Sequence, residues 1–306
     1  MNRSAPESRV HEWLDYYTEF PYFSVEAVRD GCYPRIMEHP EATEKAVVLV
    51  HGLSDSPYFM TAIGEYFFNE LKCNVYLPLL HAHGLRNPAG MEEVSLREWK
   101  ANVNYAVKRA KPRAGQVAIG GLSTGGTLSF YTAVTNPDIT GTLYFFSAAL
   151  DLAGGFVGDL TERLLRVPGL VNLVELFETD KPLIGLNPYR YAYIDKDGGR
   201  ELAKLMRETD NLAAGFNQNN LFSKRVFAAH SESDETASIT GIEDLQKVAA
   251  PGRFTFYRIP KALKVAHASL VLKKPIFASN AAAGDKPLEK ANPQFQDMMQ
   301  AIAAME

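Results

Sequence analysis

Residues 116–126 read QVAIGGLSTGG, and this stretch indicates how the chain is organised. Residues 116–119 have the composition of a buried strand, and from Gly126 onward the sequence has that of a helix. Between them, Gly121-Leu122-Ser123-Thr124-Gly125 matches the pattern G-x-S-x-G. The two glycines permit a turn that larger residues would block. The stretch therefore predicts a serine at a strained turn from a strand into a helix. A glycine-rich turn that only packs the helix close to the sheet is the structural alternative.

Short apolar runs alternate with longer stretches of helical spacing on both sides of this turn. The expected strands are residues 46–50, 74–77, 116–119, 142–146, 225–229 and 253–259. The expected helices are residues 58–71, 96–111, 126–135 and 239–248. This order predicts an α/β fold in which helices cover both faces of a mostly parallel central sheet.

Residues 150–221 interrupt the alternation, because they contain apolar helical segments but no good strand. We expect a helical cap at 150–221, inserted into a core formed by residues 1–149 and 222–306. The strands on either side of the insertion end at the same edge of the sheet as the serine turn, so the cap should lie above the serine.

Two amphipathic segments lie towards the ends of the chain. Residues 10–23 present an aromatic face made of Trp13, Tyr16, Tyr17 and Phe20. Residues 295–302 present an apolar face made of Phe295, Met298, Met299 and Ile302. Packing against the body of the protein is expected for both, and contact of the first segment with a partner or a membrane is the alternative.

Composition excludes several classes of protein. The chain has 306 residues, 46% hydrophobic and 22% charged, which is typical of a globular protein with a full core. A net charge of -4 gives no field that would hold a polyanion, so nucleic acid is not an expected partner. The sequence predicts no oligomeric state. The two cysteines, Cys32 and Cys73, are too few for a disulfide scaffold, and Cys73 precedes an apolar run where a reduced, buried thiol is expected.

The hydropathy pattern predicts no transmembrane segment. The longest aliphatic stretch, residues 46–50, is far shorter than the roughly 18 residues that span a bilayer. The first residues lack the apolar core of a signal peptide, so a cytoplasmic location is the default expectation, although a chain whose leader had been removed would begin in the same way.

A serine hydroxyl is a weak nucleophile, so Ser123 needs a base, and the base needs an orienting carboxylate. Downstream of a G-x-S-x-G turn these follow in the order acid, then histidine. Only His230 and His267 follow Ser123. Because His230 ends an expected strand and His267 follows the last strand by a loop, His267 is the expected base, with an exposed loop histidine as the structural alternative.

The acid should come from the loop after the strand at 225–229, which offers Glu232, Asp234 and Glu235. Spacing alone does not separate the three. Asp234 is preferred because its short side chain can reach His267, and Glu232 and Glu235 stay as alternatives.

Acyl transfer also needs donors for a developing oxyanion. The backbone N–H of Thr124, directly after the serine, is one candidate. The second is the N–H of Leu53, because Gly52 lets the chain turn tightly after the strand at 46–50. His51 is then structural. His81-Ala82-His83 could bind a metal, but no third ligand lies nearby, and we expect neither a metal nor a cofactor.

With these residues in place, the chain resembles the serine α/β-hydrolases, in their carboxylesterase and monoacylglycerol-lipase-like branch, over residues 46–267. The resemblance rests on His51-Gly52-Leu53, on PLLHAHG at 78–84 where that branch has a Gly-His-Gly loop, and on Trp99, Gly121 to Gly125, Asp234 and His267. It implies the α/β-hydrolase fold, a catalytic triad of Ser123, Asp234 and His267, and oxyanion donors at Leu53 and Thr124. Two features depart from the family pattern: Ala82 precedes His83-Gly84, and residues 268–292 separate the histidine from the last helix.

The expected function is hydrolysis of a small-molecule carboxylic ester through an acyl-enzyme on Ser123. The leucine, valine and phenylalanine residues of the insertion favour short to medium acyl chains, because each buried methylene contributes about 0.8 kcal/mol. A thioesterase, amidase or peptidase would use the same triad. A non-catalytic ligand-binding protein on the same fold is the alternative from another class.

Overall fold

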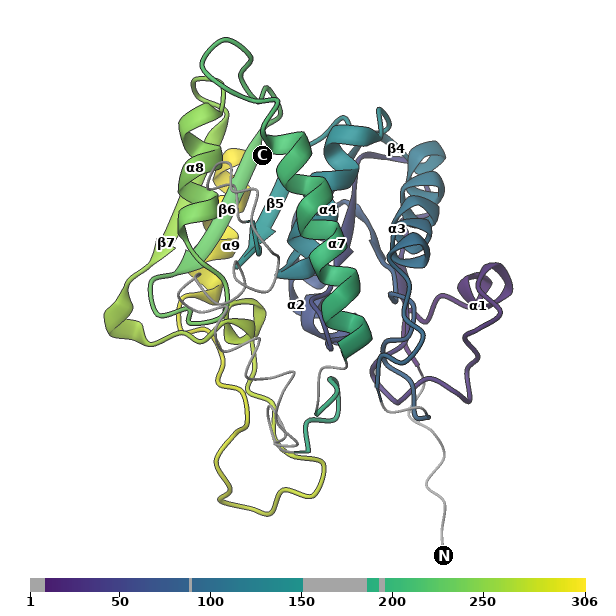
Figure 1. Cartoon of the computed structure of the whole chain (residues 1–306). Helices are drawn as coiled ribbons and strands as arrows, with labels where there is room; N and C mark the ends of the chain where they lie inside the picture. Colours follow the sequence, from purple (N-terminus) through teal and green to yellow (C-terminus); the bar gives the residue numbers. More distant parts are fainter. Residues whose placement is uncertain (1–8, 88–89, 151–185, 193–195) are drawn as a thin grey trace, which may run out of the picture.

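A computed structural model describes residues 9–87, 90–150, 186–192 and 196–306. Within these residues one sheet of seven strands has the order β1-β3-β2-β4-β5-β6-β7 (Figure 1). The strands are β1 (Arg35–Met37), β2 (Thr43–Val50), β3 (Asn74–Leu77), β4 (Ala114–Leu122), β5 (Leu143–Phe146), β6 (Val226–Ser231) and β7 (Phe254–Ile259). Neighbouring strands are parallel except β1 and β3. The six expected strands are all present. The additional β1 is a three-residue antiparallel edge strand, too short to produce a recognisable sequence pattern.

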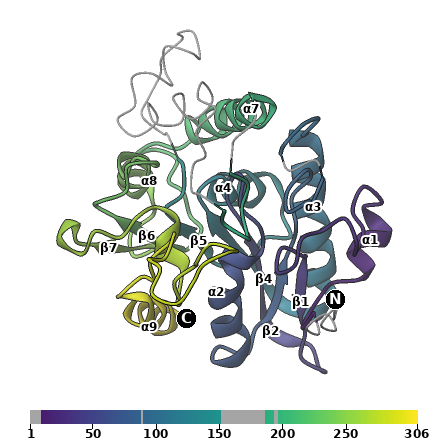
Figure 2. The same ribbon diagram turned by 90° about the horizontal axis from the view of Figure 1, so that it is seen from below.

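Helices cover both faces of the sheet. They are α1 (Asp15–Glu19), α2 (Tyr58–Asn69), α3 (Leu96–Ala110), α4 (Thr124–Thr135), α7 (Lys196–Ala213), α8 (Thr240–Val248) and α9 (Phe295–Met305), with the short 3-10 helices η1 (Lys111–Arg113), η2 (Lys261–Leu263) and η3 (Ala268–Val271). In Figure 2, α2 and α9 lie on one side of the sheet and α3, α4 and α8 on the other. The arrangement confirms the predicted fold class. In the described part of the chain, no helix is both long and apolar enough to cross a bilayer.

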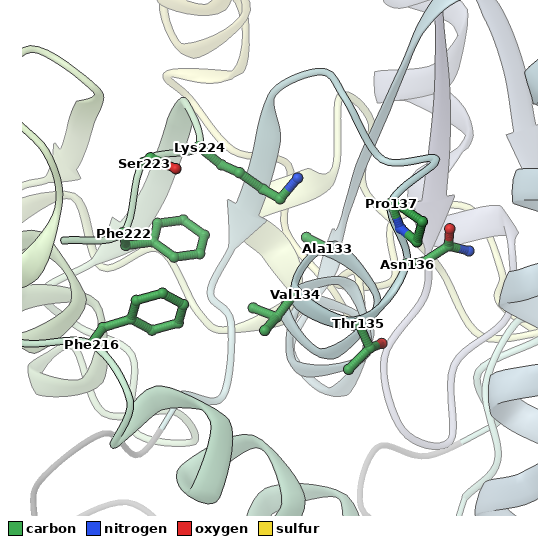
Figure 3. Close-up of a pocket in the computed structure, with 9 residues that line it drawn as sticks. All are labelled: Ala133, Val134, Thr135, Asn136, Pro137, Phe216, Phe222, Ser223 and Lys224. Carbon is green, nitrogen blue, oxygen red and sulfur yellow. The ribbon is translucent and has the colours of Figure 1, made fainter. Parts of the chain in front are cut away.

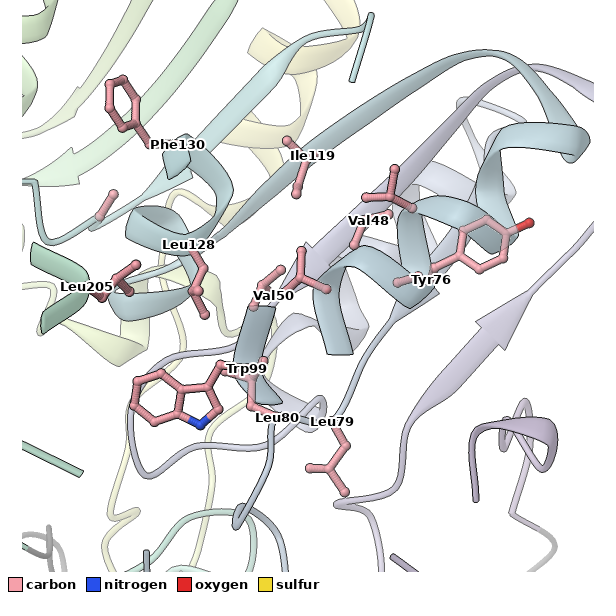
Figure 4. Close-up of a cluster of buried hydrophobic side chains, with 14 of the residues drawn as sticks. Val48, Val50, Tyr76, Leu79, Leu80, Trp99, Ile119, Leu128, Phe130 and Leu205 are labelled. Atoms are coloured by element: carbon pink, nitrogen blue, oxygen red, sulfur yellow. The ribbon is translucent and has the colours of Figure 1, made fainter. Parts of the chain in front are cut away.

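The core lies in two layers, one on each face of the sheet. Along β2, Val48 and Val50 belong to the layer beneath α3 and α4, whereas Val47 and Leu49 belong to the layer beneath α2 and α9. This alternation follows from the two-residue period of a strand. The part of a parallel strand that is buried on both faces needs apolar side chains at successive positions, which explains the continuous aliphatic run at residues 46–50. Figure 4 shows the first layer, where Trp99 lies near Leu80 and Leu128 near Leu205.

Helix α7 falls inside the range expected to form the cap. It lies over the outer side of α4 (Figures 1 and 2). Leu205 is buried in the same cluster as Leu128, and the Glu201 carboxylate accepts the Leu96 N–H at the start of α3 over 2.9 Å. These contacts fix α7 to α3 and α4. Residues 151–185, which carry most of the apolar segments that suggested a cap, lie outside the described residues, so the cap and its boundaries stay a prediction.

Both amphipathic segments pack against the body. Helix α1 is short, but Trp13 and Tyr16 are buried, and the Trp13 ring stacks on Tyr105 of α3 with centroids 5.4 Å apart. The Tyr16 hydroxyl donates to the Leu79 carbonyl over 2.8 Å. The apolar face of α9 is likewise buried. Cys32 and Cys73 are free and buried, as expected for Cys73.

Two glycines of β4 provide a matched test of this packing. A Cβ at Gly120 would lie 2.5 Å from the Tyr144 carbonyl oxygen of β5, whereas the nearest atom to a Cβ at Gly115 would be the Glu44 oxygen at 3.1 Å. We expect Gly120→Ala to lower the free energy of unfolding by about 1–3 kcal/mol, because the sheet must shift to admit the methyl group. Gly115→Ala should cost clearly less. Urea denaturation followed by far-UV circular dichroism measures both, and equal losses would contradict this account.

Candidate functional site

The backbone of Ser123 is strained and firmly held. Its φ of 53° and ψ of -120° put a residue with a side chain in a region that favours glycine. The Ser123 N–H donates to the Phe146 carbonyl over 3.1 Å, and the Ser123 carbonyl accepts the Gly126 N–H over 2.8 Å and the Ala149 N–H over 3.3 Å. Strand β5 and the first turn of α4 thus hold the serine in a conformation it would not adopt alone.

The glycines on either side make this turn possible. A Cβ at Gly125 would lie 2.1 Å from the Val50 carbonyl oxygen of β2, and a Cβ at Gly121 would lie 2.5 Å from the same atom. Neither position can carry a side chain without moving β2. The serine therefore lies at the tight turn expected from the sequence, at the carboxyl end of β4, where α4 begins.

The structure brings Asp234 and His267 together. His267 lies after β7, directly before η3, and its Nδ1 is 2.7 Å from the Asp234 Oδ2. The other Asp234 oxygen accepts the backbone N–H groups of Thr236 at 2.8 Å and Ala237 at 3.0 Å. The Asp234 side chain is fully buried. The aspartate is therefore fixed by its own loop and faces the histidine.

The two other acids of the loop, Glu232 and Glu235, are exposed. The Glu232 carboxylate accepts the backbone N–H of Lys261 over 3.1 Å. Of the three acids considered from the sequence, Asp234 is the one for which the structure records a hydrogen bond to His267.

Charge and burial have opposite effects on the pKa of Asp234 and on the pKa of His267. Burial lowers the pKa of His267, but the Asp234 carboxylate and its hydrogen bond raise it, and the net result lies above the ordinary 6.5. Burial raises the pKa of Asp234, and the facing His267 outweighs it, so the net pKa is well below its usual range. With Nδ1 donating to the aspartate, Nε2 is the ring nitrogen free to exchange a proton.

A second histidine lies beside the aspartate. The Nε2 of His230 is 3.6 Å from the Asp234 Oδ2 and 3.1 Å from the Ala237 carbonyl oxygen. Burial lowers the pKa of His230, so this ring is neutral at ordinary pH. His230 contacts the aspartate at a longer distance than His267 does, which agrees with the interpretation that His267 is the base.

The loop of residues 51–57, between β2 and α2 and called here the β2–α2 loop, lies beside the serine. A Cβ at Gly52 would lie 3.3 Å from the Ser123 Cβ. Strands β2 and β4 are neighbours with Val50 opposite Gly121, so Leu53 and Thr124 follow adjacent strand ends. The two residues expected to supply oxyanion donors therefore lie on the two segments that flank Ser123.

Both ring nitrogens of His51, the histidine interpreted as structural, contact backbone groups. The Leu80 N–H donates to its Nε2 over 3.1 Å, so Nδ1 carries the proton and donates to the Gly52 carbonyl over 2.9 Å. Burial lowers the pKa of His51 well below 6.5, which keeps the ring neutral. The histidine thus ties the β2–α2 loop to the chain that follows β3.

The histidines of the His81-Ala82-His83 stretch also have structural contacts. The Ser95 N–H donates to His81 Nδ1 over 3.3 Å, and the Trp99 indole N–H donates to the His81 carbonyl over 3.1 Å. The Nδ1 of His83 lies 2.9 Å from the same carbonyl oxygen. Among the described residues, no group of three or more His, Cys, Asp or Glu side chains could hold a metal ion.

Three charged residues near His267 were not singled out from the sequence: Asp55, Arg190 and Glu289. Asp55 raises the pKa of His267 and Arg190 lowers it, although both effects are smaller than that of Asp234. Arg190 bonds to Asp55 and Glu289, which are 135 and 99 residues away in the chain. No spacing rule connects residues so distant, and only the fold brings them together.

A hollow of about 260 Å³ lies between the end of α4 and the chain before β6 (Figure 3). Its lining includes Val134, Phe216, Phe222 and Lys224. Helix α4 begins directly after the serine, and its last residues, which line the hollow, lie roughly 14–17 Å further along the helix. The hollow therefore lies at the amino ends of the strands, at the opposite edge of the sheet from Ser123.

Comparison with known proteins shows the fold. No family model matches the chain. A thermostable monoacylglycerol lipase from Bacillus sp. (strain H-257) is 35% identical over 115 residues, which cover 37% of this chain and 45% of that protein. The match therefore spans less than half the length of that relative.

The solved structures cover most of the chain. One, from work on the metagenome-derived lipolytic enzymes LipS and LipT, has a TM-score of 0.63 at 18% identity and covers 91% of this chain and 98% of its own. The Paleococcus ferrophilus monoacylglycerol lipase has a TM-score of 0.57 at 17% identity, with coverages of 89% and 96%. A soluble variant of the Saccharomyces cerevisiae monoglyceride lipase has a TM-score of 0.56 at 14% identity, with coverages of 89% and 91%. The chain has the α/β-hydrolase fold.

The pair of His267 and Asp234 can be tested by titration. We expect the imidazole of His267 to titrate above 6.5 in the unmodified protein, because the Asp234 carboxylate stabilises its charged form. Asp234→Asn should lower this pKa, since burial then opposes the charge with less compensation. Glu232→Gln, in the same loop but exposed, should leave it unchanged. Nuclear magnetic resonance of the histidine ring protons against pH measures all three, and a larger shift in Glu232→Gln would move the assignment to Glu232.

Proposed function

We propose that this chain is a serine hydrolase that cleaves carboxylic esters, with Ser123, Asp234 and His267 as its triad. The observation that carries the proposal is the 2.7 Å contact between His267 Nδ1 and Asp234 Oδ2, at the edge of the sheet where Ser123 occupies a strained turn. This pair can accept a proton at His267 Nε2 and stabilise the charge that forms. The relatives named above, which are lipolytic enzymes, support the same activity.

The proposed reaction has two halves. The Ser123 Oγ attacks the ester carbonyl carbon while its proton passes to His267 Nε2. The resulting oxyanion accepts hydrogen bonds from the N–H groups of Leu53 and Thr124. When the intermediate collapses, the carbon–oxygen bond to the alcohol breaks and the alcohol takes the proton from His267. The acyl group stays on Ser123.

Water completes the cycle. His267 takes a proton from a water molecule, and the hydroxide attacks the acyl carbon. Collapse of the second intermediate breaks the bond to Ser123 Oγ, which recovers the proton, and the carboxylic acid leaves. Throughout, Asp234 stays ionised, in agreement with its lowered pKa, and holds the imidazole in the tautomer that both halves need.

The nucleophile is tested by one substitution with a matched control. Ser123→Ala should abolish hydrolysis of p-nitrophenyl acetate and labelling by a fluorophosphonate probe, because both need the Ser123 oxygen. Ser129→Ala removes a buried hydroxyl in the same helix, which donates to the Gly125 carbonyl, and should keep both activities. Circular dichroism should be unchanged in both variants. More than a few per cent of wild-type turnover in folded Ser123→Ala would overturn the assignment.

Short to medium acyl chains are the proposed substrates, and the apolar composition of residues 150–221 supports this preference. Monoacylglycerols are a candidate class, because the Bacillus relative is a monoacylglycerol lipase. Thioesters, amides and peptides are the alternatives that the same triad would attack.

A series of p-nitrophenyl esters that differ only in acyl length tests the preference. We expect kcat/KM to rise from acetyl to about octanoyl, by up to roughly fourfold per methylene that is buried, and then to fall. The constant leaving group ensures that the acyl chain alone changes. A maximum at palmitoyl would contradict the preference for short to medium chains while leaving ester hydrolysis intact.

A further inference from the structure

A buried arginine connects three segments around the candidate site. Arg190 donates from Nε to Asp55 Oδ1 over 2.7 Å, and its Nη1 donates to Glu289 Oε1 over 2.8 Å. Exposed fractions of the three side chains are 11% for Arg190, 2% for Asp55 and 5% for Glu289. Buried charges persist when they are paired, so each member of this cluster depends on the others.

The first segment in this cluster is the β2–α2 loop. Asp55 lies two residues after Leu53, and a Cβ at Gly52 would lie 2.5 Å from the Asp55 Oδ2. The intervening Ser54 has a φ of 63°, a conformation that costs free energy for any residue but glycine. The Tyr191 N–H donates to the Ser54 carbonyl over 2.9 Å. Arg190 and Tyr191 therefore hold the strained loop through one side chain and one backbone group.

Arg190 itself lies in the second segment, residues 186–192, and the third segment follows His267. The Ile276 N–H donates to the Glu289 carbonyl over 2.9 Å, which closes the chain between them into a loop. The Ser279 N–H donates to the Leu186 carbonyl over 3.0 Å. The loop of residues 276–289 is thus bonded to residues 186–190 at two places, one of them through Arg190.

This arrangement gives a role to the chain between the histidine and the last helix. Residues 268–292 are one of the two features in which the sequence departs from the pattern of the family that it resembles. They supply Glu289, the second carboxylate that Arg190 needs. Removing the guanidinium would leave two buried carboxylates facing each other, and the β2–α2 loop would lose its side-chain contact with residue 190.

We propose that Arg190 is a positioning residue for the ester hydrolysis proposed above, on which this inference rests. Its guanidinium, shared between Asp55 and Glu289, holds the β2–α2 loop so that the Leu53 N–H stays beside Ser123. The arginine does not touch the reacting atoms. It acts through the loop, and its loss should therefore affect the stabilisation of the oxyanion more than the binding of the ester.

The electrostatic surroundings of His267 support the same assignment. The charged and titratable groups that face His267 are Asp234 and His230, from β6 and the loop after it, and Asp55, Arg190 and Glu289. Asp55 raises the pKa of His267 and Arg190 lowers it. A change in this cluster should therefore move the pH profile of the reaction as well as kcat.

The test measures steady-state hydrolysis of p-nitrophenyl acetate, a small ester that has little acyl surface to misplace. Arg190→Met should lower kcat by about tenfold or more and change KM by less than about threefold, because a loop displaced by a fraction of an ångström impairs the transition state more than the ground state. Arg190→Lys keeps a charge but loses the fork that reaches both carboxylates, and should have an intermediate kcat.

Arg9→Met is the matched control. Arg9 also bridges two carboxylates, Glu12 at 2.7 Å and Asp30 at 3.2 Å, and its side chain is 17% exposed, but it lies in the N-terminal segment. Its kcat should stay within about twofold of the unmodified protein even if its melting temperature falls. A folded Arg190→Met whose kcat matches that of Arg9→Met would overturn the inference.

Asp55→Asn provides a second, independent readout. Removing this negative charge should lower the pKa of His267, so the acid limb of kcat/KM should move to lower pH.

If Arg190→Met does not fold, Arg190→Lys and Asp55→Asn decide, and unchanged kcat and pH profiles in both would overturn the proposal. Fluorophosphonate labelling of the unmodified protein distinguishes a failure of the proposed function from a failure of the role of Arg190. If the unmodified protein neither reacts with the probe nor hydrolyses esters, the proposed function is refuted, and the role of Arg190 with it.

Discussion

The Val50 carbonyl oxygen occupies the space that a side chain at Gly121 or Gly125 would need, and this steric constraint governs the site. Because both positions are glycine, β4 can turn into α4 within one residue, and that residue is Ser123 with its φ of 53°. Hydrogen bonds from β5 and from the first turn of α4 compensate the strain. The serine is therefore held at the end of β4, the central strand of the described sheet. A loop could not fix a side chain as rigidly.

The sequence was informative wherever one physical demand acted on consecutive residues. The buried part of a parallel strand covered on both faces is mostly apolar, so residues 46–50 of β2 and the strand β5 were recognisable. The tight turn requires glycine at fixed offsets, so Ser123 was recognisable too. The acid that orients His267 was harder to identify, because Glu232, Asp234 and Glu235 have similar chemistry. The short side chain of Asp234 favoured it, and the structure distinguishes it by its hydrogen bond to His267 and by the N–H groups of Thr236 and Ala237 that its carboxylate accepts.

Other features could not be predicted for equally physical reasons. Strand β1 has three residues, too few for a period to appear. Helix α7 has the spacing of any amphipathic helix, and its place against α4 depends on contacts such as Leu205 with the core. The cluster of Asp55, Arg190 and Glu289 consists of charged residues in three separate segments. Charged residues usually lie on the surface, so nothing local indicates that these three are buried together.

The distribution of the aromatic residues has a spectroscopic consequence. The chain contains two tryptophans. Trp13 of the N-terminal segment and Trp99 of α3 are both buried, and both belong to the core layer on the α3 and α4 side of the sheet. Intrinsic fluorescence excited at the red edge of the indole band therefore reports on that layer alone, because the layer beneath α2 and α9 contains no tryptophan. Detachment of the N-terminal segment would shift half of the emitters towards water, and the loss of α9 would leave the emission maximum where it was.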